Sequence, residues 1–383
     1  MRCVPPSARR PGVAECLADR APTRRSPSAG QRAVSRQRPD ALTVVDVDPG
    51  SPRYGQVVGW ADLPTVGDEL HHFGWNVCSS ALAHEGHNMN NLERRYLLLP
   101  GLRSSNVHIY DTRPDPTSPT LVKTIDAKEL AAKASYSRPH TLHCGPEGIF
   151  VSCLGGADSA DGPGGIALLD HSTFDVLGPW ETDRGPQYLA YDAWWHLAQN
   201  TLVTSEWGTP SMIEDGVNPE LLLGNKYGHA LHFWDLAAGK HLQRVDLGAE
   251  HQMVLELRPA HDPQAAWGFV GVVSTQDLRL GGIVSRAAHP AASDQRLAGG
   301  PQMVEVSRDG RRVYLTNSLY GAWDDQFYPD GVGAWLAKID ADPIGGLAVD
   351  REFFLHGDDF RGLRVHQVRL QGGDASSDSY CYR

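Results

Sequence analysis

The sequence predicts an all-β protein built as a β-propeller, because two strand patterns repeat along the chain and the pattern of a long helix is absent. A short apolar run that ends in aspartate recurs at intervals of 59 to 65 residues through most of the chain. Each run is followed by a turn and a second β-rich segment, and no stretch has the pattern of a long helix. Four short strands per period of about 60 residues are typical of propeller blades. A sandwich would also contain short alternating strands, but it would not repeat the same hairpin pair so regularly.

The repeated elements can be followed in order along the chain. The apolar runs are LTVVD ending at Asp46, VHIYD at Asp111, ALLD at Asp170, HFWD at Asp235 and AKID at Asp340. Between them lie paired strand segments such as PQMVEVSRDGRRVYLTNSLYG, whose Asp-Gly pair is a strong hairpin-turn signal. The last interval is 105 residues long, too long for one period and too short for two. The segment between Ser274 and Gly300 has weak strand character, so we expect part of the repeat to be missing or compressed there.

Two regions of different character divide the chain. Residues 1–40 are rich in Arg, Ser and Pro and poor in acidic and aromatic residues, so they are predicted to be disordered. Residues 41–383 are predicted to form the propeller domain. No apolar run follows Arg9 and Arg10, so an export signal is not expected.

Composition excludes several classes of function. The formal net charge is −11, which disfavours nucleic acid as a partner, and no apolar run has the length of a membrane span. The six cysteines form no CxxC pair or disulfide framework, which favours a reducing compartment such as the cytoplasm. The Gly-rich stretch 156–165 lacks the lysine of a phosphate-binding loop, and there is no GxSxG nucleophile motif.

The stretch DELHHFGWNVCSS, residues 68–80, carries the strongest chemical signal. It places His71, His72 and Cys78 close together, and imidazole and thiol groups are ligands that copper and zinc accept. On a regular strand adjacent side chains point to opposite faces, so at most one of the two histidines would face a shared metal. The alternative is a turn whose histidines bond to the backbone and whose cysteine is simply buried.

Other histidines recur at equivalent places in the repeat. The innermost strands of a propeller line a central channel, so residues distant in sequence can converge there. We therefore expect a copper or zinc site in the channel, although each histidine could instead bond to a neighbouring backbone group. Besides His71 and His72, the candidates are His140, His143, His251 and His366 on inner strands and His261 at a turn.

Further polar and thiol side chains follow or lie on the same strands. Glu206, Asp324 and Asp325 come after predicted strands and could orient a metal-bound histidine or cap a loop. Cys144 and Cys153 are expected in the core.

Several long segments together resemble the selenium-binding protein family, which includes methanethiol oxidase. They are DELHHFGWNVCSS, RPHTLHC, TSEWG, AGGPQMVEVSRDGRRVYLTNSLYGAWDDQFYPD and HQVRLQGGDASSDSY, within residues 41–380. The resemblance implies a propeller of about seven blades and a copper-dependent oxidase. Such an enzyme turns methanethiol and O2 into formaldehyde, hydrogen sulfide and hydrogen peroxide. Some members bind selenium through the cysteine of the GWNxCSS motif.

The family's functional residues can be carried onto this sequence. The resemblance assigns selenium binding to Cys78, with a small thiol and O2 as the reacting partners. Two rival interpretations are a non-catalytic selenium- or metal-binding protein and a propeller that serves as a scaffold for other proteins. The implied catalytic residues are His71, His72, His140, His143 and His366, and the implied copper ligands are the same five together with His261.

Three departures from the family pattern are visible. Position 81 is Ala81, where many members have a second cysteine after the GWNxCSS motif. The Arg-rich N-terminal segment stands where the family has an opening strand. The short linker between Ser274 and Gly300 replaces about one blade, so we expect six to seven blades or an open seam at residues 275–300.

Overall fold

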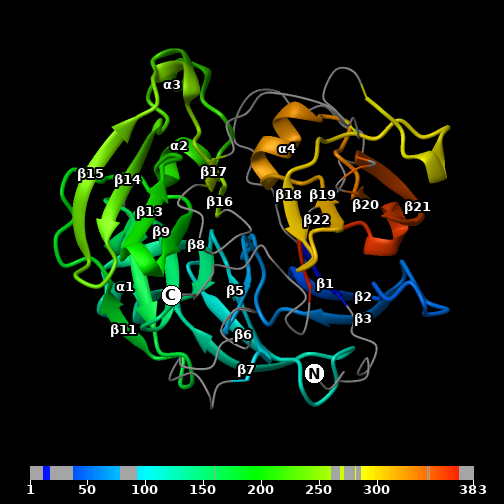
Figure 1. Ribbon diagram of the computed structural model, residues 1–383, viewed down its shortest axis with the longest axis horizontal. Coiled ribbons are helices and arrows are strands. Elements are labelled where there is room, and N and C mark those ends of the chain that lie inside the picture. The colour runs from blue at the N-terminus through cyan, green and yellow to red at the C-terminus, as the bar shows by residue number, and fades with distance from the viewer. Residues whose placement is uncertain are drawn as a thin grey trace.

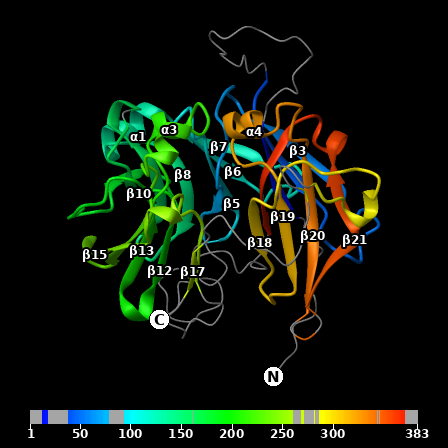
Figure 2. The same ribbon diagram turned by 90° about the horizontal axis from the view of Figure 1, so that it is seen from above.

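The computed structural model describes residues 12–17, 38–77, 93–159, 161–259, 268–270, 281, 286–342, 344 and 346–370. These residues confirm the all-β prediction. They form five four-stranded antiparallel sheets and one two-stranded sheet, which stand around a common centre in a propeller-like arrangement (Figure 1). Seen from above, the sheets of β8 to β15 and of β18 to β21 lie on opposite sides of that centre (Figure 2).

One sheet joins the two ends of the chain. Its strands, from the centre outward, are β22 (Arg364–Leu370), β1 (Gly12–Leu17), β2 (Ala41–Val45) and β3 (Val57–Asp62). Strand β1 pairs antiparallel with β2 and with β22, so the expectation of disorder is corrected for residues 12–17. Composition did not predict this strand because its hydrogen-bond partners lie on both sides and one of them is at the far end of the chain.

The next three sheets are built from consecutive antiparallel strands. The second consists of β4 (Gly74–Trp75), β5 (Tyr96–Pro100), β6 (Val107–Asp111) and β7 (Thr120–Ile125). The third consists of β8 (Tyr136–Cys144), β9 (Ile149–Gly156), β10 (Gly165–Leu169) and β11 (Val176–Pro179). The fourth consists of β12 (Ala193–His196), β13 (Thr201–Ser205), β14 (Ala230–Asp235) and β15 (Lys240–Asp246).

The repeat is interrupted where the sequence predicts a missing segment. In the described part of the chain, the fifth sheet consists of β16 (Leu257–Pro259) and β17 (Gly268–Val270). A complete sheet follows, with β18 (Met303–Val306), β19 (Arg312–Thr316), β20 (Trp335–Asp342) and β21 (Gly346–His356). Every one of the five Asp-ending runs contributes the third strand of its sheet, namely β2, β6, β10, β14 or β20. The repeat read from the sequence therefore marks equivalent strands.

The described part of the linker, residues 286–300, packs onto the last sheet. Leu297 is buried in an apolar cluster with Leu315 and Trp335. The carbonyl oxygen of Ala298 accepts hydrogen bonds from Trp335 Nε1 at 2.9 Å and from Asn317 Nδ2 at 3.2 Å. This part of the linker therefore covers apolar surface of the sheet that follows it. Whether the shortened ring closes or leaves an open seam stays a prediction.

The helices are short and lie between strands or at their ends. Helix α1 begins after Asp126, whose carboxylate accepts a hydrogen bond from the Glu129 amide at 2.8 Å. Among the described residues, no helix is long and apolar enough to cross a membrane. The α-helices are α1 (Ala127–Ala134), α2 (Pro210–Ile213), α3 (Pro219–Leu223) and α4 (Gly321–Phe327). The short 3-10 helices are Ala157–Ser159, Leu197–Gln199, Ala249–His251, Pro290–Ala292 and Gly357–Phe360.

Candidate metal centre

The segment that precedes β4 turns His71 and His72 toward the same region. Glu69 and His72 have positive φ angles of 53° and 38°, so this segment is not a regular strand. The two imidazoles therefore do not alternate between faces, and they stack with ring centroids 4.7 Å apart and planes 15° apart. On a regular strand at most one of the two histidines would face a shared metal. That restriction does not apply to this irregular segment. The backbone is held by hydrogen bonds from His71 N to Pro100 O and from Leu142 N to His72 O.

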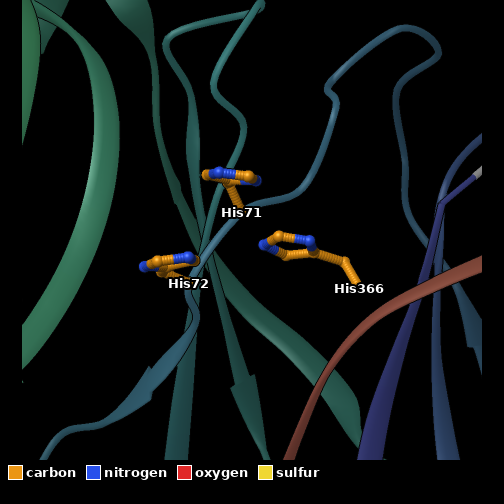
Figure 3. A group of neighbouring side chains, drawn as sticks. All are labelled: His71, His72 and His366. Atoms are coloured by element: carbon orange, nitrogen blue, oxygen red, sulfur yellow. The ribbon is translucent and has the colours of Figure 1, made fainter. Parts of the chain in front are cut away.

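Two inner strands bring further imidazoles to the pair. His366 in β22 stacks on His71 with a centroid distance of 4.0 Å. His140 in β8 lies 4.4 Å from both His71 and His72. All four side chains are buried. Figure 3 shows His71, His72 and His366 pointing toward one another, and one nitrogen from each of these three lies within 4.8 Å of the others.

The hydrogen bonds of these imidazoles show which nitrogens remain for a ligand. Among the residues that the structure describes, both ring nitrogens of His71 and the Nε2 atoms of His140 and His366 have no hydrogen-bond partner. An unsatisfied buried polar group costs about 1–3 kcal/mol. A bound metal ion would satisfy these nitrogens, so the donor set fits copper or zinc. His72 differs, because its Nδ1 lies 3.1 Å from Thr141 Oγ1 and its Nε2 lies 3.4 Å from Glu256 Oε1.

Proximity and hydrogen bonding therefore favour slightly different ligand sets. Mutual distance groups His71 and His366 with His72, whereas unpartnered nitrogens group the same pair with His140. His71 and His366 are common to both sets. A metal ion held here would therefore have these two as candidate ligands, with His140 or His72 as a third.

Burial favours the neutral form of His71, His140 and His366. It lowers the pKa of His71 and of His140 well below the ordinary value, and the neighbouring histidines lower both further. Burial also lowers the pKa of His366 to about 4, although its hydrogen bond to a backbone carbonyl acts in the opposite direction. A neutral imidazole is the form that binds a metal.

A short chain of hydrogen bonds fixes the ring of His366. Its Nδ1 donates to the carbonyl oxygen of Ser318 at 2.7 Å, which leaves Nε2 for a metal. The Ser318 hydroxyl donates to Asp324 Oδ2 at 2.6 Å, and the Leu319 amide donates to Oδ1 at 3.2 Å. Asp324 thus bonds to Ser318 and Leu319 rather than to a ring nitrogen of His366, and both alternatives for its role stay predictions. Burial raises the pKa of Asp324 to about 6, while nearby Arg364 opposes this shift.

Other polar candidates have different surroundings. Glu206 accepts a hydrogen bond from His232 Nε2 at 2.8 Å and others from the backbone amides of His229 and Ala230. These contacts match the loop-capping alternative. Asp325 lies at the surface, 3.4 Å from Arg364 Nη1.

Several predicted site residues lie elsewhere or outside the described residues. His143 Nε2 lies 3.0 Å from Asp192 Oδ1, and its ring packs against Trp195. His143 shares β8 with His140, but the strand register is irregular between Pro139 and Thr141, and the His143 ring faces Asp192 and Trp195. His251 is exposed. Cys78 and His261 fall outside the described residues, so their predicted roles stay predictions.

The two cysteines expected in the core are both buried. Cys144 and Cys153 have almost no exposed surface. Burial raises the pKa of Cys153 above its ordinary value, so this thiol stays protonated.

The structure adds residues that the sequence patterns did not single out. The Tyr191 hydroxyl lies 3.4 Å from His72 Nε2 and donates to Glu256 Oε1 at 3.2 Å. The rings of Trp207 and Tyr320 contact His71, with centroids 6.5 Å and 6.2 Å away. No local motif marks Tyr191 or Glu256, because their position depends on how neighbouring sheets meet. Trp207 directly follows Glu206 in the TSEWG motif, and this neighbour was the one sequence feature that could have pointed to it.

Comparison with known proteins identifies the family. The sequence model described as 56kDa selenium binding protein (SBP56) matches residues 27–278 and 272–381. The chain belongs to the selenium-binding protein family. Selenium-binding protein 1 of Arabidopsis thaliana is 32% identical over 437 residues, covering 89% of this chain and 88% of the plant protein. Methanethiol oxidase of Homo sapiens is 32% identical, covering 91% of this chain and 92% of the human protein.

A solved structure supports the same assignment. The hypothetical selenium-binding protein from Sulfolobus tokodaii is 40% identical to this chain and superimposes with a TM-score of 0.85. The superposition covers 98% of this chain and 96% of that protein. The resemblance to the selenium-binding protein family is confirmed by both sequence and structure.

The alignments with the selenium-binding relatives also show that this chain is shorter than they are. The alignment with methanethiol oxidase of Xenopus laevis spans 443 positions, although this chain has only 383 residues. That relative therefore contains segments that this chain lacks. The two matches to the family model meet at residues 272–278, at the start of the linker where the sequence predicts a loss.

Proposed function

We propose that this chain is a copper-dependent oxidase that converts methanethiol, O2 and water into formaldehyde, hydrogen sulfide and hydrogen peroxide. The observation that carries the proposal is the cluster of four buried imidazoles, three of which keep nitrogens without partners in the described part of the chain. The relatives named methanethiol oxidase supply the substrate and the reaction. A soft, redox-active ion suits both the imidazole ligands and a thiol substrate.

The chain's own residues prepare the site for this chemistry. His71 and His366 would hold copper, with His140 or His72 as a further ligand. Bound copper would supply a site for the substrate thiolate and would exchange single electrons. The Ser318 carbonyl fixes which nitrogen of His366 carries the proton.

Two features of the surroundings complete the site. Burial of the four imidazoles excludes water and makes interactions between charges stronger than in bulk solvent. Glu256 Oε1, which lies beside Tyr191 and His72, is the atom that we assign to accept the proton of the substrate thiol.

Three finer assignments belong to the same proposal. The six sheets are the blades of one propeller, whose fifth blade is reduced to β16 and β17. Cys78 binds selenium as a single thiolate, because the second cysteine of many members is replaced by Ala81. The protein works in the cytoplasm, where cysteine thiols remain reduced.

A second candidate function is selenium or metal binding without catalysis. It is favoured by the two-stranded fifth sheet and by Ala81, both of which depart from the pattern of the catalytic relatives. A protein of this kind would bind copper at the histidines yet leave methanethiol unchanged.

Metal analysis combined with a peroxide assay tests these candidates. Protein produced with copper available should contain about one copper per chain and release hydrogen peroxide when methanethiol is added. His366→Ala should lose most of the copper and the activity, whereas the exposed His251→Ala should keep both. Copper without peroxide would leave the non-catalytic alternative, and wild-type protein without copper would refute the oxidase and the metal-binding alternative and favour the scaffold interpretation.

A further inference from the structure

Trp207 stands between the histidine centre and a buried group of aromatic side chains. It is almost completely buried and follows β13. Its ring contacts two imidazoles of the histidine centre and other aromatic rings. Its neighbours, with their centroid distances, are Trp323 at 5.4 Å, Tyr191 at 5.5 Å, His140 at 5.9 Å, Tyr320 at 6.5 Å and His71 at 6.5 Å.

The aromatic series continues from Trp207 toward the protein surface. Trp323, in α4, contacts Tyr227 and Phe327, each with a centroid distance of 6.3 Å. Phe327 is exposed. The partly buried side chains of Met212 and Met253 pack against the same apolar cluster.

Backbone contacts hold the outer end of this series together. The Trp323 indole donates to the carbonyl of Ile213 at 2.8 Å. The Tyr227 hydroxyl donates to the carbonyl of Met212 at 2.9 Å. Trp323 and Tyr227 are thereby fixed beside the backbone of Ile213 and Met212, in the cluster against which Met212 and Met253 pack.

The chemistry of these side chains differs from that of an aliphatic core. Indole, phenol and thioether groups lose an electron more readily than leucine, valine or phenylalanine side chains do. A metal centre that reacts with O2 and produces peroxide exposes its own ligands to oxidation. A series of oxidisable side chains that contacts two of those ligands can be oxidised in place of the ligands.

We propose that Trp207 and Trp323 form an electron relay that protects the histidine centre from oxidation, with Met212 and Met253 as its final electron donors. This inference rests on the proposed copper site. Hydrogen peroxide is the oxidant, and it is a product of the proposed reaction.

Electrons move inward along the relay in single steps. Trp207 would give one electron to the histidine centre after hydrogen peroxide has oxidised it, and Trp207 would thereby become an indole radical cation. Trp323 then restores Trp207 by giving it one electron, and a methionine restores Trp323. Loss of two electrons from one methionine, with addition of a water oxygen and release of two protons, leaves methionine sulfoxide. The two electrons reduce one hydrogen peroxide, with two protons, to two water molecules.

Isotope labelling with peptide mapping tests the relay. The copper-loaded full chain is treated with hydrogen peroxide in water enriched in oxygen-18, and oxidised residues are located by mass spectrometry. We expect sulfoxide at Met212 or Met253 that carries oxygen from water, with His71 and His140 mostly intact. Direct attack by peroxide would instead place unlabelled peroxide oxygen on the sulfur.

Substitution of the first relay residue gives the second arm of the test. Trp207→Phe keeps a buried ring but should raise oxidation of His71 and His140 several-fold and remove the water-derived label from methionine. Trp195→Phe is the matched control, because Trp195 is equally buried and lies in a different apolar cluster. If Trp207→Phe does not fold, Trp323→Phe interrupts the relay one step further out.

The outcomes separate the relay from the proposed function. Copper binding with the same oxidation pattern in wild type and Trp207→Phe overturns the relay alone. An unlabelled sulfoxide in wild-type protein does the same. Failure of the wild-type chain to bind copper overturns both the relay and the proposed oxidase.

Discussion

A buried ion pair connects the last sheet to the segment that carries the histidines. Arg369 Nη1 donates to Glu305 Oε2 at 3.0 Å, and Arg369 Nε donates to the carbonyl of Phe73 at 3.1 Å. The other carboxylate oxygen of Glu305 accepts the Leu370 amide at 2.8 Å. Both charged side chains are almost completely buried, with exposures of 3% and 0%. The pair therefore ties β18 and β22 to the residue directly after His72.

Arg369→Met would leave the Glu305 carboxylate buried without its charged partner. Breaking a buried pair in this way costs about 3–5 kcal/mol, and the lost hydrogen bond to Phe73 adds about 1 kcal/mol. Denaturant unfolding should show this loss as a large shift of the transition midpoint to lower denaturant. We also expect weaker copper binding, because Phe73 directly follows His72.

Two control variants sharpen this test. Lys133→Met breaks an exposed pair with Glu129 and should cost no more than about 1 kcal/mol. The double variant Glu305→Leu with Arg369→Met removes both charges and should be more stable than Arg369→Met alone. A loss below about 1 kcal/mol for Arg369→Met, or a double variant less stable than the single, would refute the reasoning.

Four other changes have defined expected outcomes. Thr141→Val removes the hydroxyl that contacts two imidazoles of the centre and should weaken copper binding about 10–100-fold in a competition titration. Asp324 has its pKa raised to about 6 in the folded chain from 3.8, so the stability it contributes is present below pH 3.8 and is lost as pH rises to about 6. Asp324→Asn should remove this pH dependence, on the order of 3 kcal/mol, from unfolding curves measured across that range. Leu297→Ala should cost about 2–5 kcal/mol and should speed proteolysis within residues 286–300, whereas unchanged cutting would mean that the linker is held by other contacts. Cys78 should react with a thiol reagent in the native protein, and labelling only after denaturation would show a buried structural role.

The fold was largely predictable because each sheet repeats one local signal. The runs that end at Asp111 and Asp235 mark third strands, since that strand is buried and its aspartate begins a turn. The short strand β1 was not predictable from composition. Its stability comes from pairing with β2 and β22, which no window of local sequence contains.

The candidate site was predictable in part. His140 and His366 were found from their equivalent places on inner strands, and the structure brings both to His71. Both His71 and His72 point inward because this segment has a positive φ angle. The alternation of side chains along a regular strand gives no sign of such an angle. His143 was chosen for the same reason as His140, as a histidine on a predicted inner strand, but its Nε2 lies beside Asp192.

The contribution of Tyr191 and Trp207 could not be predicted from local patterns. Tyr191 precedes β12 and Trp207 follows β13, and neither position has a periodic signature of its own. Their contacts with His72 and His140 arise only when separate sheets meet at the centre. Geometry of this kind is set by tertiary packing rather than by sequence spacing.

The sheet that joins β22, β1 and β2 imposes an order of events on a newly made chain. His71, His72 and His140 leave the ribosome well before His366, so a growing chain carries an incomplete set of ligands. Strand β1 is made first, yet its pairing with β22 can form only after almost the whole chain has been synthesised. Any metal site that includes His366 can therefore be completed only after β22 has been made and has paired with β1.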